Sequence, residues 1–436
     1  MSNGAARSNN VLVVGGGVAG MQAALDVANQ GYKVYLVEKA PSIGGRMAAL
    51  DKTFPTLDCS ACILTPRLSE VARHPNIELL TYSEVQSVEG SLGDFTVRVL
   101  RKARYVREDR CSGCGDCARE CPVEVPNEFD EFLGFRKAIY VMFPQSTPNV
   151  YTIDAEHCIR CKRCERVCER GAIDFDMQDE IVELKVGVVV LSVGYKLFDV
   201  RQYPRLGYGH HRNVITAMEF ERLINAAGPT KGHLIRLSDG RMPKRIGFIQ
   251  CVGARDVKKG VPNCSRVCCM YGIKNAVMAR EHYPDAEVTV YYADIRAFGK
   301  GFEEFYEMAK TRFGVKFIKG RVGEIVEDPE TANLQFYVED TLSGEILDVE
   351  HDMIVLCPGL QPAEDLDKLA EMLGLETSTD GYIETRDAFA APLETNHPGI
   401  LVCGCADGPK DIPDSVTAGS AAAMKATILL SSGGAK

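Results

Sequence analysis

The stretch Val11-Leu-Val-Val-Gly-Gly-Gly-Val-Ala-Gly20 decides the fold of this chain. Its first four residues are an apolar run that predicts a buried strand, and the glycines that follow match the pattern G-x-G-x-x-G. A helical pattern then covers Met21–Gln30, and a second strand from Lys33 to Val37 ends in Glu38. Strand, glycine turn, helix, strand and acidic residue in this order predict a dinucleotide-binding unit.

Each residue of this turn has its own task in such a unit. Gly15 permits the tight turn, Gly17 lets the backbone approach a pyrophosphate, and Gly20 lets the helix pack on the strand. Glu38 lies 23 residues after Gly15, where it would accept hydrogen bonds from the ribose hydroxyls, and Lys39 follows it. The fingerprint alone does not separate FAD from NAD.

Two further glycine turns favour FAD. Gly44-Gly45-Arg46 lies just past the second strand, where flavoproteins with two dinucleotide-binding domains commonly carry a second glycine pair. Near the C-terminus, a strand beginning at Gly399 enters the turn Gly404-Cys405, and a helix rich in small residues is expected over Asp414–Leu429. This closing turn usually reads Gly-Asp, so we expect Asp407 or Asp414 to make the contact to the ribityl chain.

Composition limits the class of protein. The 436 residues exceed one ordinary domain, and the net charge of −10 disfavours nucleic acid as a partner. We find no apolar run long enough to span a bilayer and no secretory signal, so we expect a cytoplasmic protein. Seventeen cysteines in such a chain indicate metal or cluster ligands in a reducing, anaerobic setting.

Eight of these cysteines form two copies of the bacterial ferredoxin run C-x-x-C-x-x-C-x-x-x-C. Each run gives three ligands to its own [4Fe–4S] cluster and the fourth to the other cluster. The expected ligand sets are Cys111, Cys114, Cys117 and Cys168 for the first cluster, and Cys158, Cys161, Cys164 and Cys121 for the second. Arginines and lysines crowd the second run; they would dock an acidic partner or form a solvated face.

A third cysteine group occupies a position where a nucleotide would be expected. A strand over Ile246–Ile249 precedes it and a helix over Ile273–His282 follows it, as in a second nucleotide-binding half, but no G-x-G-x-x-G is present. NAD(P) is therefore disfavoured there. The four thiols predict a third cluster on Cys251, Cys264, Cys268 and Cys269, or a three-ligand cluster with one spare thiol.

Cys59 and Cys62 form a C-x-x-C pair outside these groups. The pair would be a redox dithiol near the flavin, a half-site for a cluster, or two ordinary buried thiols. Of these, the redox dithiol is the candidate catalytic feature.

Taken together, these motifs resemble the A subunit of heterodisulfide reductase over nearly the whole chain. The resemblance rests on the glycine fingerprint, the double ferredoxin run and the third cysteine group, and on three further stretches: Phe54–Pro66, Asp294–Lys300 and Pro409–Ser415. It implies an α/β, thioredoxin-reductase-like flavoprotein with two dinucleotide-binding domains and an inserted 2[4Fe–4S] ferredoxin-like domain. It also implies FAD and an unusual [4Fe–4S] cluster on the four cysteines of the second domain, making three clusters in all.

The resemblance further implies flavin-based electron bifurcation or confurcation within a complex. Partners would be other subunits of a heterodisulfide-reductase-like complex and a ferredoxin, hydrogenase or formate dehydrogenase-type donor; a homodimer is compatible with this. The chain resembles a short form without the C-terminal ferredoxin domain. Alternatives are an NAD(P)H-dependent ferredoxin or disulfide oxidoreductase, and a non-bifurcating relay subunit of a quinone-linked or sulfur-metabolising complex.

The expected domain boundaries follow from these motifs. They are 8–105, 181–240 and 361–436 for three parts of the FAD-binding domain, 106–180 for the ferredoxin-like insertion, and 241–360 for the second Rossmann-like domain.

Overall fold

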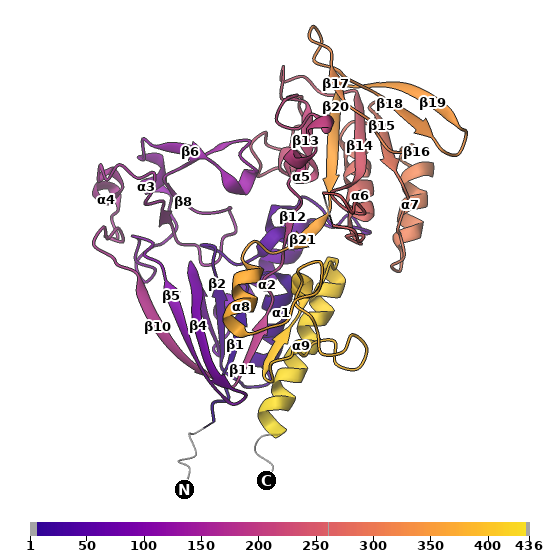
Figure 1. Ribbon diagram of the computed structural model, residues 1–436. Coiled ribbons are helices and arrows are strands. Elements are labelled where there is room, and N and C mark those ends of the chain that lie inside the picture. Colours follow the sequence, from indigo (N-terminus) through magenta and orange to yellow (C-terminus); the bar gives the residue numbers. More distant parts are fainter. Residues whose placement is uncertain (1–6, 260, 433–436) are drawn as a thin grey trace. The chain divides into compact units, whose positions relative to one another are not determined.

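The computed structural model describes residues 7–259 and 261–432, which form two compact units (Figure 1). Unit 1 takes the described residues up to Ala48, then Ala61–Tyr195, and those from Pro362 onward. Unit 2 takes Ala49–Ser60 and Lys196–Gln361. The short strands β12 (Tyr195–Leu197) and β21 (Leu360–Pro362) lie where the chain passes from one unit to the other and back.

Unit 1 is built on a five-stranded parallel sheet. Its strands, in spatial order, are β22 (Ile400–Val402), β11 (Val188–Leu191), β1 (Val11–Val14), β2 (Val34–Glu38) and β3 (Ile77–Thr81). The central strands β1 and β11 consist of valine and leucine only and are almost wholly buried, as strands of a parallel sheet covered on both faces must be. The strand predicted over residues 11–14 is confirmed.

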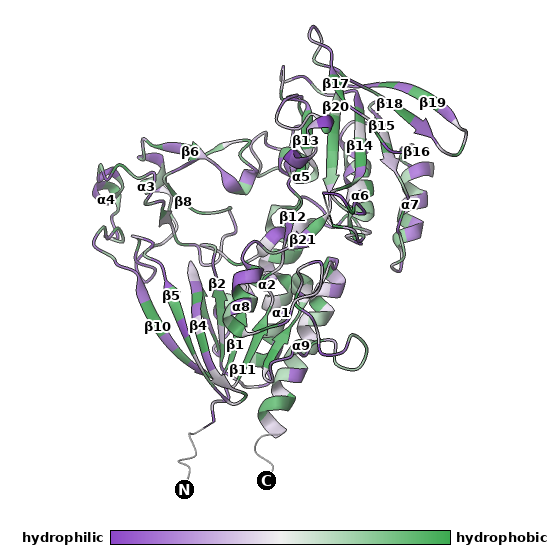
Figure 2. Cartoon of the chain, in the orientation of Figure 1, coloured by the Kyte–Doolittle hydropathy of each residue, from purple (hydrophilic) through white to green (hydrophobic). Residues whose placement is uncertain are grey.

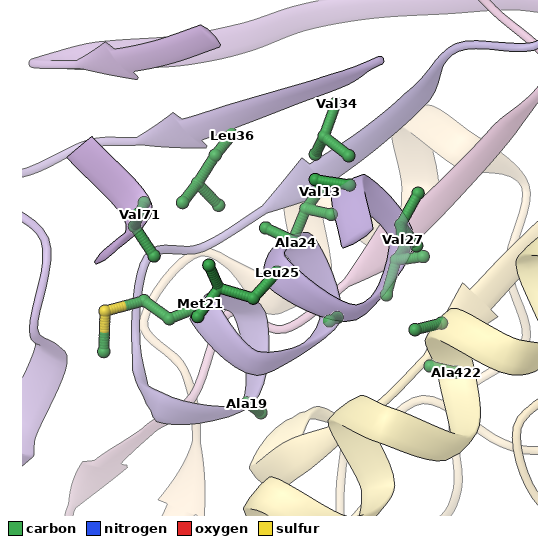
Figure 3. Close-up of a cluster of buried hydrophobic side chains, with 14 of the residues drawn as sticks. Val13, Ala19, Met21, Ala24, Leu25, Val27, Val34, Leu36, Val71 and Ala422 are labelled. Atoms are coloured by element: carbon green, nitrogen blue, oxygen red, sulfur yellow. The ribbon is translucent and has the colours of Figure 1, made fainter. Parts of the chain in front are cut away.

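Helices α1 (Val18–Asn29), α2 (Ser60–Arg73) and α9 (Ile412–Ser432) contribute to the core on one face of this sheet. Figure 3 shows side chains from β1, β2 and α1 packed together, with Ala422 of α9 beside them. Small residues let α1 and α9 approach closely, since a Cβ on Gly419 would collide with the carbonyl oxygen of Ala19. Helix α1 begins at Val18 rather than at Met21, so the glycine turn leads directly into its first turn.

An antiparallel sheet and helix α8 (Leu366–Leu373) contribute to a second core. The sheet contains β10 (Glu180–Val186), β5 (Asp94–Arg101) and β4 (Ser83–Ser91). Alternate residues of β5, Phe95, Val97 and Val99, are buried in this core, which also contains Leu12 of β1. The period of two in β5 thus gives one buried face and one more exposed face.

The cysteine-rich segment is inserted between β5 and β10 and belongs to unit 1. Its elements are α3 (Asp116–Arg119), β6 (Glu124–Pro126), β7 (Phe135–Lys137), β8 (Ile139–Tyr140), β9 (Thr152–Ile153) and α4 (Arg163–Val167). A small core of its own contains Val106, Ile139 and Ile173 together with the buried thiols Cys117 and Cys164. Cysteine therefore takes the place of ordinary core residues in this segment.

Unit 2 contains a second five-stranded parallel sheet. Its strands, in spatial order, are β13 (Val214–Thr216), β20 (Met353–Pro358), β14 (Arg245–Val252), β15 (Glu287–Tyr292) and β16 (Lys316–Lys319). Its helices are α5 (Ala217–Ile224), α6 (Cys268–His282) and α7 (Phe302–Thr311). Unit 2 also contains a separate three-stranded sheet. Its strands are β17 (Val326–Glu327), β18 (Leu334–Asp340) and β19 (Glu345–His351). Strand β20 is green along its length in Figure 2, in keeping with its full burial.

Short 3-10 helices complete the described elements. They are η1 (Gly45–Ala49), η2 (Glu128–Asp130), η3 (Val200–Gln202), η4 (Pro204–Leu206) and η5 (Gly404–Ala406).

The segment 196–240 corrects our domain boundaries. We assigned 181–240 to the FAD-binding domain, but residues 196–240 belong to unit 2. The reason is that β13 pairs in parallel with β20, and α5 follows β13 directly through a capping box on Thr216 and Glu219. A three-residue strand carries too little sequence pattern to show which sheet it joins.

A buried ion pair holds α5 and α6 together inside unit 2. Lys274 and Glu221 are hydrogen-bonded, and their side chains are only 2% and 3% exposed. Glu221 also accepts the N–H of Asp51 at 3.0 Å, and the guanidinium of Arg222 donates to the carbonyl of Ala49 at 3.0 Å. Helix α5 therefore holds the segment Ala49–Ser60 in unit 2.

Replacing Lys274 with methionine should destabilise the protein by about 3–5 kcal/mol, because Glu221 would stay buried without its counter-charge. Unfolding in urea, followed by circular dichroism, measures the change. The matched control is Lys300→Met, which breaks the pair with Glu304 where Lys300 is 96% exposed, and it should cost less than about 1 kcal/mol. Equal effects of the two variants would contradict the structural role of the buried pair.

Candidate functional site

The glycine turn after β1 has the close contacts that a dinucleotide cradle requires. Gly15 has φ +104°, and a Cβ there would collide with the carbonyl of Ser192, which follows β11. A Cβ on Gly20 would collide with the carbonyl of Gly15. By contrast, a Cβ on Gly17 would meet nothing within 4 Å, so the backbone before α1 faces open space. The N–H groups at the start of α1 are thereby left accessible to an anion.

Glu38 lies at the end of β2, beside this turn. Its carboxylate accepts the N–H of Gly16 at 2.6 Å and that of Ala40 at 2.8 Å. Burial raises the pKa of Glu38. Each carboxylate oxygen keeps a second lone pair that could accept a ribose hydroxyl, as predicted. Lys39 points elsewhere and pairs with Asp365 at 3.4 Å on the surface.

The second glycine pair lies against the first turn. Gly44 and Gly45 both have positive φ, +126° and +56°, and a Cβ on Gly45 would come within 2.9 Å of the Cα of Gly17. Arg46 lies 3.6 Å from Glu131. The predicted glycines of the two turns thus form one continuous backbone surface.

The closing turn after β22 also lies beside the start of α1. Gly404 has φ +64°, and a Cβ there would come within 2.8 Å of the Cβ of Ala19 in α1. Asp407 pairs with Lys410 at 2.6 Å, and burial raises its pKa in spite of this partner. Three glycine turns of unit 1 therefore converge at the start of α1. Such a backbone-lined cradle suits the pyrophosphate and ribityl chain of FAD.

The second predicted cluster set surrounds one cavity. This cavity is lined by Cys121, Cys158, Cys161 and Cys164 together with Ile139, Ile153 and Phe175. Cys121 comes from the first ferredoxin run and the other three cysteines from the second, which is the exchange that the spacing predicts. An apolar wall of this kind keeps water from a cluster.

The thiols of this segment need a positive partner to ionise. Burial raises the pKa of Cys117 to about 12 and that of Cys164 to about 11, and neighbouring cysteines add to both shifts. Thiolates in such a pocket are stabilised when iron supplies the compensating charge. The donor set therefore fits [4Fe–4S] clusters.

The third cysteine group gathers at the carboxyl end of β14. Cys251 has φ +60°, and its thiol hydrogen-bonds with that of Cys268; this hydrogen bond is the largest cause of the raised pKa of Cys251, followed by burial. Cys268 in turn hydrogen-bonds with Cys269. The backbone N–H of Arg266 donates to the sulfur of Cys264 at 3.3 Å. Cys251 and Cys268 are thus neighbours in space although they are far apart in sequence.

Helix α6 begins earlier than we predicted. It starts at Cys268 and not at Ile273, so Cys268 and Cys269 both lie in its first turn. Their side chains leave the helix in different directions, and the Cys269 thiol donates to the carbonyl of Asp294 at 3.4 Å. Both cysteines therefore belong to the first turn of a regular helix.

Two neighbours of this group were not predicted. Cys357, at the end of β20, is fully buried, and the charges of Cys268 and Cys251 contribute to its raised pKa. Arg255 hydrogen-bonds with Cys251 and pairs with Asp294 at 2.8 Å. Cys357 follows an apolar strand parallel to the one that precedes Cys251, so strand alignment was the signal that could have identified it.

Cys59 and Cys62 are both disulfide-bonded, whereas the other fifteen cysteines are free. Cys62 is exposed and Cys59 is partly buried, so the interpretation as two ordinary buried thiols is wrong. Their role as a redox pair stays a prediction.

Within residues 7–259 and 261–432, no helix is long and apolar enough to cross a membrane. In the same residues, no three His, Cys, Asp or Glu side chains converge as ligands of a metal ion.

Three known protein families match parts of the chain. Residues 10–116 match the family described as FAD dependent oxidoreductase, residues 110–173 the 4Fe-4S dicluster domain, and residues 270–423 the pyridine nucleotide-disulphide oxidoreductases. The predictions of FAD and of iron–sulfur clusters as cofactors are thereby confirmed.

Among solved structures, the thioredoxin reductase of T. acidophilum is similar in fold. The TM-score is 0.54 at 14% sequence identity, and the match covers 98% of this chain and 100% of the other. The predicted fold is confirmed. The chain therefore combines segments that match FAD dependent oxidoreductases and 4Fe-4S dicluster domains with a thioredoxin-reductase-like fold.

Proteins similar in sequence indicate the kind of protein more narrowly. The chain is 56% identical to the iron-sulfur A subunit of CoB--CoM heterodisulfide reductase from Methanocaldococcus jannaschii, over 97% of its own length. It is 51% identical to the A subunit of H(2):CoB-CoM heterodisulfide,ferredoxin reductase from Methanothermobacter thermautotrophicus, over 96%. The chain spans 64% of the length of each. The predicted resemblance is confirmed: this chain is a relative of the A subunit of heterodisulfide reductase.

Replacing Gly15 with alanine should remove most of the bound flavin, because the new Cβ would displace the backbone of Ser192 from the turn. Flavin per chain, measured by absorbance after denaturation, gives the result. Gly31→Ala is the control, since Gly31 also has positive φ (+90°) but has nothing within 4 Å of the added Cβ. Flavin content in Gly15→Ala equal to that of the control would contradict the assignment.

Replacing Cys121 with serine should remove the cluster held by the second ferredoxin run, lowering iron by about four atoms per chain. Iron analysis and electron paramagnetic resonance of the reduced protein measure this. Cys403→Ser is the control; Cys403 is buried and free but directly follows β22, outside both ferredoxin runs, and the iron content should not change. Unchanged iron in Cys121→Ser would refute the exchange of ligands between the two runs.

Proposed function

We propose that this chain is the FAD and iron–sulfur electron-transfer subunit of a heterodisulfide-reductase-type complex. The observation that carries the proposal is the cysteine group at the carboxyl end of β14, the place where a nucleotide binds in this type of sheet. A cluster held by thiols in that position would carry single electrons, whereas a bound NAD(P)H would donate a hydride. Cys251, Cys264, Cys268 and Cys269 would hold the third [4Fe–4S] cluster.

The turn after β14 argues against NAD(P) at this position. Gly253 has φ +74°, and a Cβ there would overlap the ring of Phe198. A Cβ on Gly17 of unit 1 would instead point into open space. Cys251 occupies a left-handed conformation that glycine would normally fill. Side chains therefore fill the volume that a pyrophosphate needs.

Electron bifurcation or confurcation is the form of transfer that we propose. When bound, FAD supplies exchange between two-electron and one-electron transfer, and the clusters supply one-electron carriers. Unit 1 would hold the flavin on its glycine turns, and the buried thiols of both units would hold the clusters away from water. The relatives' printed names include heterodisulfide and ferredoxin, which supports acceptors of these two kinds.

Partners of the chain would be the other subunits of such a complex and a ferredoxin, hydrogenase or formate dehydrogenase-type donor, in the cytoplasm. The second ferredoxin run offers a basic surface for an acidic partner: Arg160, Lys162, Arg163 and Arg170 are exposed there, opposed by few carboxylates. Positive charge at this surface would speed association with a small acidic electron carrier.

A disulfide oxidoreductase is the second candidate function. It is favoured by the disulfide at Cys59 and Cys62 and by the match of residues 270–423 to pyridine nucleotide-disulphide oxidoreductases. This function would require flavin reduction by NAD(P)H in the isolated chain.

Purified anaerobically, the protein should contain one FAD and about 12 iron atoms, the number for three four-iron clusters. Cys264→Ser should lose about four of these iron atoms and keep its FAD, because only the third cluster uses this residue. The matched control is Cys357→Ala, a neighbouring cysteine outside the proposed ligand set, which should keep its iron.

The third cluster would be contradicted if the unmodified protein contained about eight iron atoms per chain and Cys264→Ser left this iron content unchanged. Stopped-flow mixing with NADPH separates the two candidate functions. The flavin should stay oxidised if the first proposal holds, and rapid bleaching would instead establish the disulfide oxidoreductase.

A further inference from the structure

One buried amide beside the third cysteine group has no partner. Gln250 is the residue before Cys251 in β14 and is only 6% exposed. Neither its Oε1 nor its Nε2 makes a hydrogen bond with any described residue. Leaving an amide unsatisfied in the interior carries a substantial free-energy cost, so a native protein satisfies such a group with a water, an ion or a ligand.

The side chain of Gln250 lies against helix α6, one turn beyond the cysteines. A Cβ on Gly272 would collide with the Nε2 atom of Gln250 and would lie 3.0 Å from the sulfur of Cys357. Gly272 follows Cys268 by four residues, so the two lie on the same face of α6. Gln250, Cys268 and Cys357 therefore share one buried space between β14, β20 and α6.

The sulfurs of this site already have hydrogen-bond donors of the same kind. Ser265 Oγ donates to the sulfur of Cys268 at 3.3 Å, and Arg266 N–H donates to that of Cys264 at 3.3 Å. Arg255 hydrogen-bonds with Cys251. The amide of Gln250 is a further donor in this space, and among the described residues nothing receives its hydrogens.

We propose that the Nε2 amide of Gln250 donates a hydrogen bond to a sulfur of the cluster held by Cys251, Cys264, Cys268 and Cys269. The inference rests on the third cluster of the proposed function. Hydrogen bonds to cluster sulfurs stabilise the more negative, reduced state and so raise the reduction potential. Gln250 is a positioning residue that sets this potential and does not ligate iron.

A neutral amide suits this position better than a charged side chain would. Cys268 and Cys269 are buried here and Cys251 and Cys264 are partly buried, and a buried lysine among them would require a full counter-charge of its own. An amide supplies two N–H dipoles without adding net charge. It can therefore shift the potential while leaving the charge of the site unchanged.

The test compares the potential of the third cluster in unmodified protein and in Gln250→Met, which has similar length and no N–H donor. The signal that disappears in Cys264→Ser identifies this cluster in a redox titration followed by electron paramagnetic resonance. Gln250→Met should lower its equilibrium constant for reduction about tenfold, which is about 59 mV for one electron. The other two clusters should keep their potentials.

Asn275→Leu is the matched control. Asn275 is also a fully buried amide on α6, with an unpartnered Oδ1, but it lies nearly two turns beyond Cys268 and donates to the carbonyl of Ala217. It should lower the stability of the fold without moving the potential. A third cluster with the same potential in unmodified protein and Gln250→Met overturns this inference alone, whereas no third cluster in unmodified protein overturns the proposed function.

A second measurement decides the question where Gln250→Met does not fold. Protein labelled with ¹⁵N in the side-chain amide of glutamine is reduced, and hyperfine spectroscopy is recorded on the third cluster. A ¹⁵N coupling supports the hydrogen bond, and its absence overturns it.

Discussion

The close approach of backbone to backbone at the carboxyl edge of the parallel sheet of unit 1 is the constraint on which this structure depends. In unit 1 the carbonyl of Gly15 lies where a Cβ of Gly20 would be, and the closing turn at Gly404 lies against Ala19. These contacts exclude side chains and leave a surface of peptide groups. A surface of that kind can meet phosphate oxygens directly, because the N–H groups carry the partial positive charge.

The two units use the same sheet edge in opposite ways. Unit 1 removes side chains from its first turn, so the volume beyond Gly17 is open. Unit 2 fills the equivalent turn with the ring of Phe198 and the thiol of Cys251, and adds Cys268 from the start of α6. One strand-turn-helix arrangement thus presents bare backbone in the first unit and thiols in the second.

The sequence alone predicted those parts of the site whose chemistry is local. The glycine turns and the ferredoxin runs are read from fixed spacings, and the cavity around Cys121 joins the residues that the spacing pairs. Contacts made by strand pairing were missed. Segment 196–240 joins unit 2 through the three residues of β13, and Cys357 and Gln250 meet only because β20 and β14 are neighbours. Such contacts depend on tertiary structure, which short apolar runs do not encode.

The cysteine-rich insertion starts and ends on two strands that pair with each other. Arg101 at the end of β5 lies opposite Glu180 at the start of β10, in an antiparallel register that continues to Phe95 and Val186. Without the insertion, these strands would be an ordinary hairpin joined by a turn. Another electron carrier could therefore be inserted at the same point of this hairpin, provided that it replaces Phe143 in the core of unit 1 and the hydrogen bond from the Thr147 N–H to Ser42 Oγ.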